Sequence, residues 1–267
     1  EKLEYEVEYG YAEQGLDFNE RKKVLADLTH ALMARLRGDI FKHWPQYLAL
    51  SQRMLAEKHI LAYSNDLETE QVLLAKNWAG EIKQTTGDYL LWADANLASL
   101  KTDKVMDREL SYSFVPTGTG KYVATVKMKY ANKGAFTKFT TRYRTYARVF
   151  LPVGSQFISV KGMGVGVAAD QGMENGKQWF GAFTSIAPGK TGELVWQFYL
   201  APSVVAQIKN NSYNLLAQKQ SGTIAHALTL DFNFATAMRR GPAEAVGDTK
   251  YSSSTDLRLD RNFEVKF

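Results

Sequence analysis

The spacing of apolar side chains changes once along the chain. Over about the first hundred residues they recur every three to four positions, which is typical of amphipathic helices. The predicted helices run over residues 17–38, over residues 45–58, and from Asn65 or Asp66 to a point before Gly80. Two short apolar runs, 59–63 and 88–96, predict strands, and the second is expected to be buried because its centre is continuously apolar.

From Arg108 onward, apolar and polar residues alternate with the period of a strand. Leu110, Tyr112 and Phe114 begin the pattern, and turns rich in glycine, proline or asparagine separate the segments that continue it. Strands are expected at residues 122–130, 143–151, 156–160, 178–186, 193–200, 214–219, 225–234 and 257–267, with an exposed loop at 239–249.

Successive strands without intervening helices indicate an antiparallel sandwich. The predicted fold class is therefore α+β and mainly β. A helical and mixed α/β region is expected over residues 1–104, and an antiparallel immunoglobulin-like β-sandwich over residues 105–267.

Composition narrows the class of protein. The 267 residues are 45% hydrophobic and 23% charged, as in a folded chain that is long enough to bury a core. No apolar run approaches the length of about 18 residues that a membrane-spanning helix needs. The chain begins at Glu1 with an acidic segment unlike a signal peptide, so we expect a fragment or a processed product, with any membrane anchor upstream.

Signals for catalysis are weak. The absence of cysteine excludes disulfides and thiol chemistry, and the four histidines never share a metal-binding spacing, so we expect neither a metal nor a cofactor. Residues 118–122 (GTGKY) resemble a phosphate loop but lie between two predicted strands, which favours a hairpin turn. Residues 162–166 (GMGVG) lack the last glycine of a dinucleotide fingerprint and favour a strand end or bulge. No catalytic residue is predicted.

Next to the buried strand at 88–96 lies the densest group of polar residues. It consists of Asp94, Asn96, Lys101, Asp103 and Arg108. One interpretation is a functional site. The other is a turn in which the aspartate and the asparagine accept hydrogen bonds from the backbone while the bases pair with acids. The sequence leaves the role of this polar cluster open.

Charge is unevenly distributed along the chain. Between Glu109 and Asp170 there are nine bases and no acid. Strand alternation turns five of these bases and one tyrosine outward: Lys127, Lys129, Arg142, Arg144, Arg148 and Tyr146. These strands are consecutive and are expected to pair, so the bases should converge on one sheet face, which would suit an anionic or sugar-containing polymer. The alternative is a solvated outer face without a ligand.

Several segments in series carry a family resemblance. They are KHILAYSND (58–66), Gln71, Trp78 with Gly80, GDYLLWADANLASLKTD (87–103), Arg108 and YRTYARVFLPVGSQFISVKG (143–162). Over about residues 16–202 this series resembles the carboxyl-terminal half of a bacterial envelope family catalogued as domain of unknown function 4012. The resemblance implies an extracytoplasmic protein with a membrane anchor, often encoded near surface-polysaccharide functions.

The amino-terminal half of that family is similar to LytR-CpsA-Psr domains, which attach glycopolymers to cell walls, and it is absent here. No pyrophosphate-binding or metal-binding residue can therefore be carried over to this chain. The family's polar cluster maps onto Asp94, Asn96, Lys101 and Arg108, and its role is not established.

We expect a non-catalytic envelope module that recognises or presents a surface glycopolymer. The alternative is the carboxyl-terminal part of a LytR-CpsA-Psr-like glycopolymer transferase. Expected partners are an anionic glycopolymer or wall component and the missing upstream domain. Nucleic acid is not expected, and a membrane is expected only through an upstream anchor. Acids and bases gathered around one pyrophosphate or metal would favour the transferase, whereas an open basic sheet face would favour the module.

Overall fold

A computed structural model describes residues 5–10, 13, 15, 17, 23–240, 244–245 and 248–267. The chain divides into two compact units, Glu1–Met54 and Leu55–Phe267. We describe each unit by itself.

The first unit contains a π-helix, η1 (Glu6–Gly10), and most of a long helix, α3 (Lys23–Ala56). The predicted helix end at Gly38 is wrong, because α3 continues through that glycine to His43, whose φ of −126° interrupts it. Pro45 follows two residues later. It has no N–H to donate to the preceding turn, so a bend is expected just before it. In the part of the chain that the structure describes, no helix is both long and apolar enough to cross a membrane.

The second unit begins with the end of α3 and a short helix, α4 (Leu67–Ala75). As predicted, Asp66 caps this helix, with its side chain accepting a hydrogen bond of 2.9 Å from the backbone N–H of Thr69. The strand predicted at 59–63 does not form. The backbone N–H of Ala62 instead bonds the carbonyl of Trp78, which links the two ends of the α4 segment.

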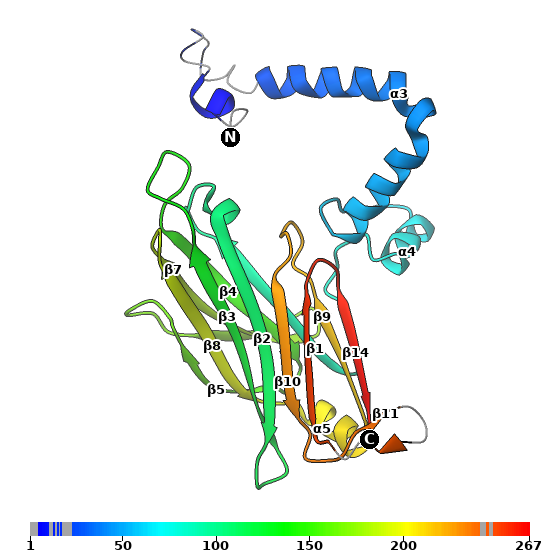
Figure 1. Cartoon of the computed structure of the whole chain (residues 1–267), viewed down its shortest axis with the longest axis vertical. Coiled ribbons are helices and arrows are strands. Elements are labelled where there is room, and N and C mark those ends of the chain that lie inside the picture. Colours follow the sequence, from blue (N-terminus) through cyan, green and yellow to red (C-terminus); the bar gives the residue numbers. More distant parts are fainter. Residues whose placement is uncertain are drawn as a thin grey trace. The chain divides into compact units, whose positions relative to one another are not determined.

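Two sheets form the body of this unit (Figure 1). The eight-stranded sheet has, in order, β12 (Glu244–Ala245), β11 (Arg239–Arg240), β14 (Arg261–Lys266), β9 (Ser212–Gln218), β1 (Asp88–Asn96), β4 (Tyr143–Pro152), β7 (Lys177–Ile186) and β6 (Asp170–Glu174). The six-stranded sheet has β13 (Lys250–Asp256), β10 (Ala227–Asn233), β2 (Met106–Pro116), β3 (Tyr122–Asn132), β8 (Thr191–Tyr199) and β5 (Gln156–Lys161).

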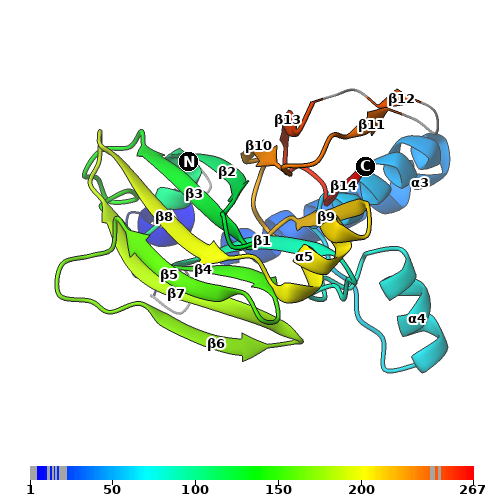
Figure 2. The same cartoon turned by 90° about the horizontal axis from the view of Figure 1, so that it is seen from below.

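Neighbouring strands are antiparallel, except that β1 pairs with β9 and β10 pairs with β2 in parallel. A short 3₁₀ helix, η3 (Thr102–Val105), precedes β2. Helix α5 (Pro202–Lys209) lies at the end of the sheets that faces the viewer in Figure 2. The prediction of a mainly β chain with a sandwich of two largely antiparallel sheets is confirmed.

The sandwich begins earlier than predicted. Strand β1 has the bounds expected from the sequence, but it lies in the middle of the eight-stranded sheet, paired with β4 and β9. The boundary at 104/105 therefore cuts through the sandwich. Strands β6 and β13 were not predicted, and the strand expected over 257–267 is limited to Arg261–Lys266. The loop expected at 239–249 contains the short strands β11 and β12, and residues 241–243 and 246–247 of it lie outside the described residues.

Aromatic side chains dominate the core between the sheets. On β2, Tyr112 and Phe114 are almost completely buried, and Phe114 stacks on Phe232 of β10 with ring centroids 4.4 Å apart. Trp196 and Phe198 of β8 complete the same layer. Burial of each such ring contributes about 2–3 kcal/mol, so the alternation seen in the sequence also accounts for the stability of the sandwich.

Candidate functional site

The bases predicted to form one basic face lie on two different faces. Strand β3 carries Lys127 and Lys129 and pairs only with strands of the six-stranded sheet, whereas β4 carries Arg144 and Arg148 in the eight-stranded sheet. The prediction that these consecutive strands pair is therefore wrong. Alternation did place the side chains on the solvent side of their strands, where all four are exposed or half-exposed. Arg142 is exposed just before β4.

On the six-stranded sheet, acids from neighbouring strands balance the bases. The ammonium group of Lys127 lies 3.6 Å from the carboxylate of Glu193, and that of Lys129 lies 3.2 Å from Glu109. The stretch without acids in the sequence is thus compensated in space by acids of the paired strands β2 and β8. Such exposed pairs contribute little to stability, and this face shows no excess positive charge along β3.

The outer face of the eight-stranded sheet is different, because aromatic residues surround its arginine. Tyr146 lies opposite Phe183 in the β4–β7 register, with ring centroids 6.0 Å apart. The guanidinium carbon of Arg148 lies 5.0 Å from the ring centre of Phe150 and 5.6 Å from that of Trp179. Such cation–π contacts hold the guanidinium group against the two rings.

We call Tyr146, Arg148, Trp179 and Phe183 the outer-face cluster. All four side chains are half-buried, with part of each open to solvent.

Two glycines allow the outer-face cluster to lie close to the sheet. A Cβ atom at Gly172 of β6 would be 2.7 Å from the indole of Trp179, and one at Gly181 of β7 would overlap the hydroxyl of Tyr146. Any other residue at these positions would push the rings away from the backbone. The sequence thus positions aromatic rings of two neighbouring strands, β4 and β7, close to the sheet, with Trp179 beside Gly172 of β6.

Carboxylates of the edge strand β6 bond the polar ends of the cluster. The hydroxyl of Tyr146 donates a 2.8 Å hydrogen bond to Asp170, and Arg148 donates a 2.7 Å hydrogen bond to Glu174. Burial and the bond to Asp170 raise the pKa of Tyr146 to about 12, so its phenol remains protonated at neutral pH. The result is a surface that offers ring faces together with donors and acceptors.

Sequence reasoning named Tyr146, Arg144 and Arg148 but missed Trp179 and Phe183. A signal was present, because Trp179 and Phe183 occupy the positions that alternate with buried ones within the predicted strand at 178–186. The acids of β6 could not be found in this way, because the strand itself was not predicted.

The predicted polar cluster does assemble, around the carboxylate of Asp94. This group accepts hydrogen bonds from Tyr130 at 2.7 Å, from Thr145 at 3.0 Å and from Arg108 at 3.2 Å. The guanidinium of Arg108 also bonds Asp103 at 2.5 Å and the hydroxyl of Tyr143 at 2.7 Å. The buried charges of Asp94 and Arg108 thus compensate each other inside the sandwich.

The remaining members of this polar cluster form a turn. Asn96 accepts a 2.9 Å hydrogen bond from the backbone N–H of Ser99, and its amide donates to Asp103. Lys101 is exposed and is not among the residues that line the neighbouring cleft. The structural interpretation therefore holds for Asn96, which accepts from the backbone, and for Arg108, which pairs with acids, but Asp94 accepts from side chains instead of the backbone.

Beside the cluster lies a cleft of about 800 Å³, whose wall includes Arg108, Gln220 and His226. Gln220 bonds both the backbone N–H and the carbonyl of Asp94, which fixes the loop after β9 against β1. Burial, followed by the charges of Arg108 and Lys219, lowers the pKa of His226 to about 3. The imidazole is therefore neutral at physiological pH and is not poised as a general base.

Neither glycine-rich motif forms a nucleotide site. Residues 118–122 make the predicted hairpin between β2 and β3, closed by a 2.7 Å hydrogen bond from the N–H of Thr117 to the carbonyl of Lys121. Residues 162–166 follow the end of β5, which itself contains a bulge between Phe157 and Ser159. Among the described residues, no group of three or more histidines and acids is arranged to hold a metal ion.

Comparison with known proteins identifies no family. No family model matches the sequence, and no curated protein matches it. Among solved structures, a putative nutrient binding protein from Legionella pneumophila is 8% identical, with a TM-score of 0.38 over 67% of this chain and 71% of that chain. An M1 zinc metallopeptidase from Deinococcus radiodurans is 10% identical, with a TM-score of 0.28 over 64% of this chain and 43% of the peptidase. Similarities this low carry no functional inference.

Proposed function

We propose that this chain is a non-catalytic module that binds a surface glycopolymer across the outer face of the eight-stranded sheet. The outer-face cluster carries this proposal. It combines half-exposed aromatic rings with a stacked arginine, and two carboxylates of β6 bond its polar ends.

Carbohydrate chemistry suits such a surface. A sugar ring has an apolar face of C–H groups and a rim of hydroxyls, so it can stack on an indole while its hydroxyls exchange hydrogen bonds with charged groups. Arg148 is already oriented by Phe150 and Glu174, so little side-chain entropy is lost when a ligand binds. Exposed Arg144 on the same strand face adds positive charge that would favour an anionic polymer.

The proposal extends to location and fold family. The series of motifs that resembles the envelope family favours an extracytoplasmic module at a bacterial cell surface, attached through an upstream anchor. Within the β-sandwich class, we propose an immunoglobulin-like arrangement. The alternative of a transferase fragment is less well supported, because Asp94 and Arg108 of the polar cluster bond each other and buried hydroxyls.

A binding titration tests the proposed function. Affinity electrophoresis and calorimetry would compare a soluble anionic wall glycopolymer, dextran sulfate and a neutral glucan. We expect Trp179→Ala and Arg148→Ala each to weaken binding of the wall polymer about tenfold or more, as for residues at the centre of an interface. Circular dichroism would show that both variants are folded.

The matched control changes bases on the opposite sheet. Lys127→Ala together with Lys129→Ala removes two charges without touching the outer-face cluster, so the affinity should stay within about twofold of wild type. Equal losses in both sets of variants, or no saturable binding of any of the three polymers, would contradict the proposed function.

A further inference from the structure

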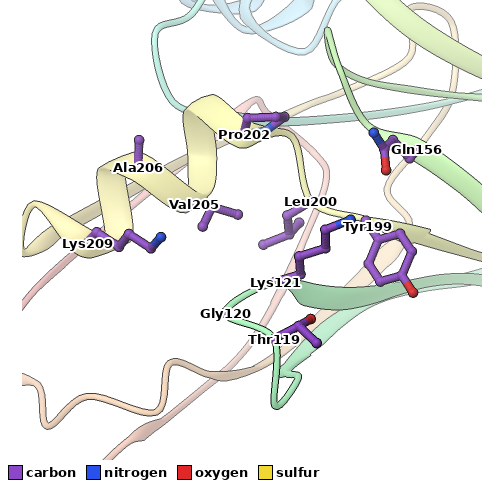
Figure 3. A pocket seen from close by; sticks show the side chains of 10 residues that line it. All are labelled: Thr119, Gly120, Lys121, Gln156, Tyr199, Leu200, Pro202, Val205, Ala206 and Lys209. Atoms are coloured by element: carbon purple, nitrogen blue, oxygen red, sulfur yellow. The ribbon is translucent and has the colours of Figure 1, made fainter.

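A second cavity, of about 340 Å³, lies between the β2–β3 hairpin and helix α5 (Figure 3). It shares no residue with the outer-face cluster or with the polar cluster. Its walls come from Thr119–Lys121 of the hairpin, from the ends of β5 and β8, and from the exposed side of α5. The cavity therefore depends on three segments that are far apart in the sequence.

The apolar part of this cavity follows from the period of α5. Val204 and Ile208 are buried against the sandwich, while the half-buried Val205 and the exposed Ala206 line the cavity. In Figure 3 the side chains of Leu200 and Val205 point toward each other across its centre. This floor can accept an apolar group.

The charged part consists of Lys121 and Lys209. No acidic side chain is present among the ten residues that line the cavity. Within the part of the chain that the structure describes, no ion pair joins either lysine to an acid. The ammonium of Lys121 lies 4.9 Å from the ring centre of Tyr199, which holds it at the cavity wall. The two lysines thus place positive charge beside an apolar floor.

We infer that this cavity binds a small organic anion, with its charged head between Lys121 and Lys209 and its apolar body on Leu200 and Val205. Lysines bind phosphate and carboxylate heads as point charges, and both heads meet this description. The volume lies at the lower end of the range of about 300–1,000 Å³ for ligand pockets, which limits the apolar body to an aryl ring or a short alkyl chain.

The test uses phenyl phosphate, benzoate and hexanoate as probes. Two controls each carry one half of the ligand: benzyl alcohol has the apolar ring without the charge, and inorganic phosphate has the charge without an apolar body. Methyl NMR resonances of Val205 and Leu200 would report binding in the full chain. We expect saturable shifts with at least one organic anion and at least tenfold weaker binding of both controls. The tighter of phenyl phosphate and benzoate would identify the preferred head group.

Two sets of variants separate charge from shape. The double variant Lys121→Gln/Lys209→Gln should weaken binding of the organic anion about tenfold or more. Val205→Trp should abolish binding, because the larger side chain would fill the apolar part of the cavity. Lys161→Gln, an exposed lysine on β5 outside the cavity, is the matched control and should change nothing.

No saturable shift with any anion, benzyl alcohol binding as tightly as phenyl phosphate, or an equal loss in the Lys161 variant would overturn the inference. The outer-face cluster is untouched by these variants, so glycopolymer binding can fail or succeed independently.

Discussion

At the scale of single residues, two buried ionisable groups, Asp88 and His226, make the free energy of unfolding depend on pH in opposite directions. Asp88 lies at the start of β1, where its carboxylate accepts hydrogen bonds of 2.6 Å from Tyr112 and 2.8 Å from Tyr213. Tyr112 belongs to the other sheet, so this contact joins the two layers. Burial nevertheless raises the pKa of Asp88 to about 6, while burial lowers that of His226 to about 3.

Replacing Asp88 with asparagine should change how stability depends on pH. The folded protein holds the Asp88 proton up to about pH 6, whereas the unfolded chain loses it near pH 3.8. Stability from this group is therefore present at low pH and is lost as pH rises through 6. Relative to wild type, Asp88→Asn should gain about 1.4 kcal/mol per pH unit between pH 4 and 6, or on the order of 3 kcal/mol in all. Urea unfolding across this range measures it, and parallel pH profiles would refute it.

Replacing His226 should have the opposite effect. The unfolded chain binds a proton at this histidine below about pH 6.5, but the folded protein resists it until about pH 3. Stability from the neutral imidazole is thus present above pH 6.5 and is lost as pH falls toward 3. Compared with wild type, His226→Gln should become relatively more stable by about 1.4 kcal/mol for each unit below pH 6. Urea unfolding between about pH 3 and pH 7 tests this, and a profile parallel to that of wild type would show that the imidazole titrates alike in the folded and unfolded chain.

At the scale of elements, Asp260 links the α4 segment to the sandwich. Its carboxylate accepts hydrogen bonds of 2.9 Å from Lys58 and Asn77, which lie on either side of α4, and one of 2.8 Å from the backbone of Lys219 after β9. The side chain of Lys58 is 1% exposed and that of Asp260 is 7% exposed. Removal of one partner would leave a buried charge without compensation.

Asp260→Ala should therefore reduce the free energy of unfolding by about 3–5 kcal/mol. The matched control is Glu264→Ala, which breaks an exposed pair with Lys266 on β14 and should cost less than about 1 kcal/mol. Hydrogen exchange should locate the loss of protection in residues 57–77. A loss for Asp260→Ala no larger than that of the control would show that this ion pair does not hold the segment.

Sequence alternation identified most strands and their buried sides, but not their partners. Period two shows which residues of β3 and β4 face inward, yet both sheets of a sandwich bury one side, so alternation cannot assign a strand to a sheet. For this reason the prediction put all five bases on one sheet face, although β3 and β4 belong to different sheets. Strand β13 escaped prediction because its sequence KYSSSTD is polar except for Tyr251, as suits an edge strand, and so shows no alternation.

The apolar content of a short segment also led to a wrong strand prediction. The run HILAY at 59–63 has the composition of a strand but forms none, and its Ala62 instead donates a backbone hydrogen bond to Trp78 at the end of the α4 segment. For the candidate site, the sequence yielded Tyr146 and Arg148. The ring of Trp179 joins them only through the β4–β7 register and the space above Gly172, neither of which is visible in a single strand.

At the scale of the whole molecule, the sandwich presents two outer faces with different chemistry. On the six-stranded sheet, bases are matched by acids from adjacent strands, as in the pair of Lys129 and Glu109. On the eight-stranded sheet, Arg148 is also paired, with Glu174, but it lies against the rings of Phe150 and Trp179. We therefore expect glycopolymer binding to depend on one face only and to weaken as salt rises beyond about 0.15 M, because part of the attraction is electrostatic.

The most direct test of this account follows the indole N–H resonances of the tryptophans during titration with a soluble anionic wall glycopolymer. Trp179 lies on the outer face, whereas Trp92 and Trp196 are 2% and 0% exposed between the sheets and serve as internal controls. The account predicts a saturable shift of the Trp179 resonance, accompanied by the amides of Gly172 and Gly181, with the two buried indoles unchanged. Saturable binding that leaves the Trp179 resonance in place would contradict it.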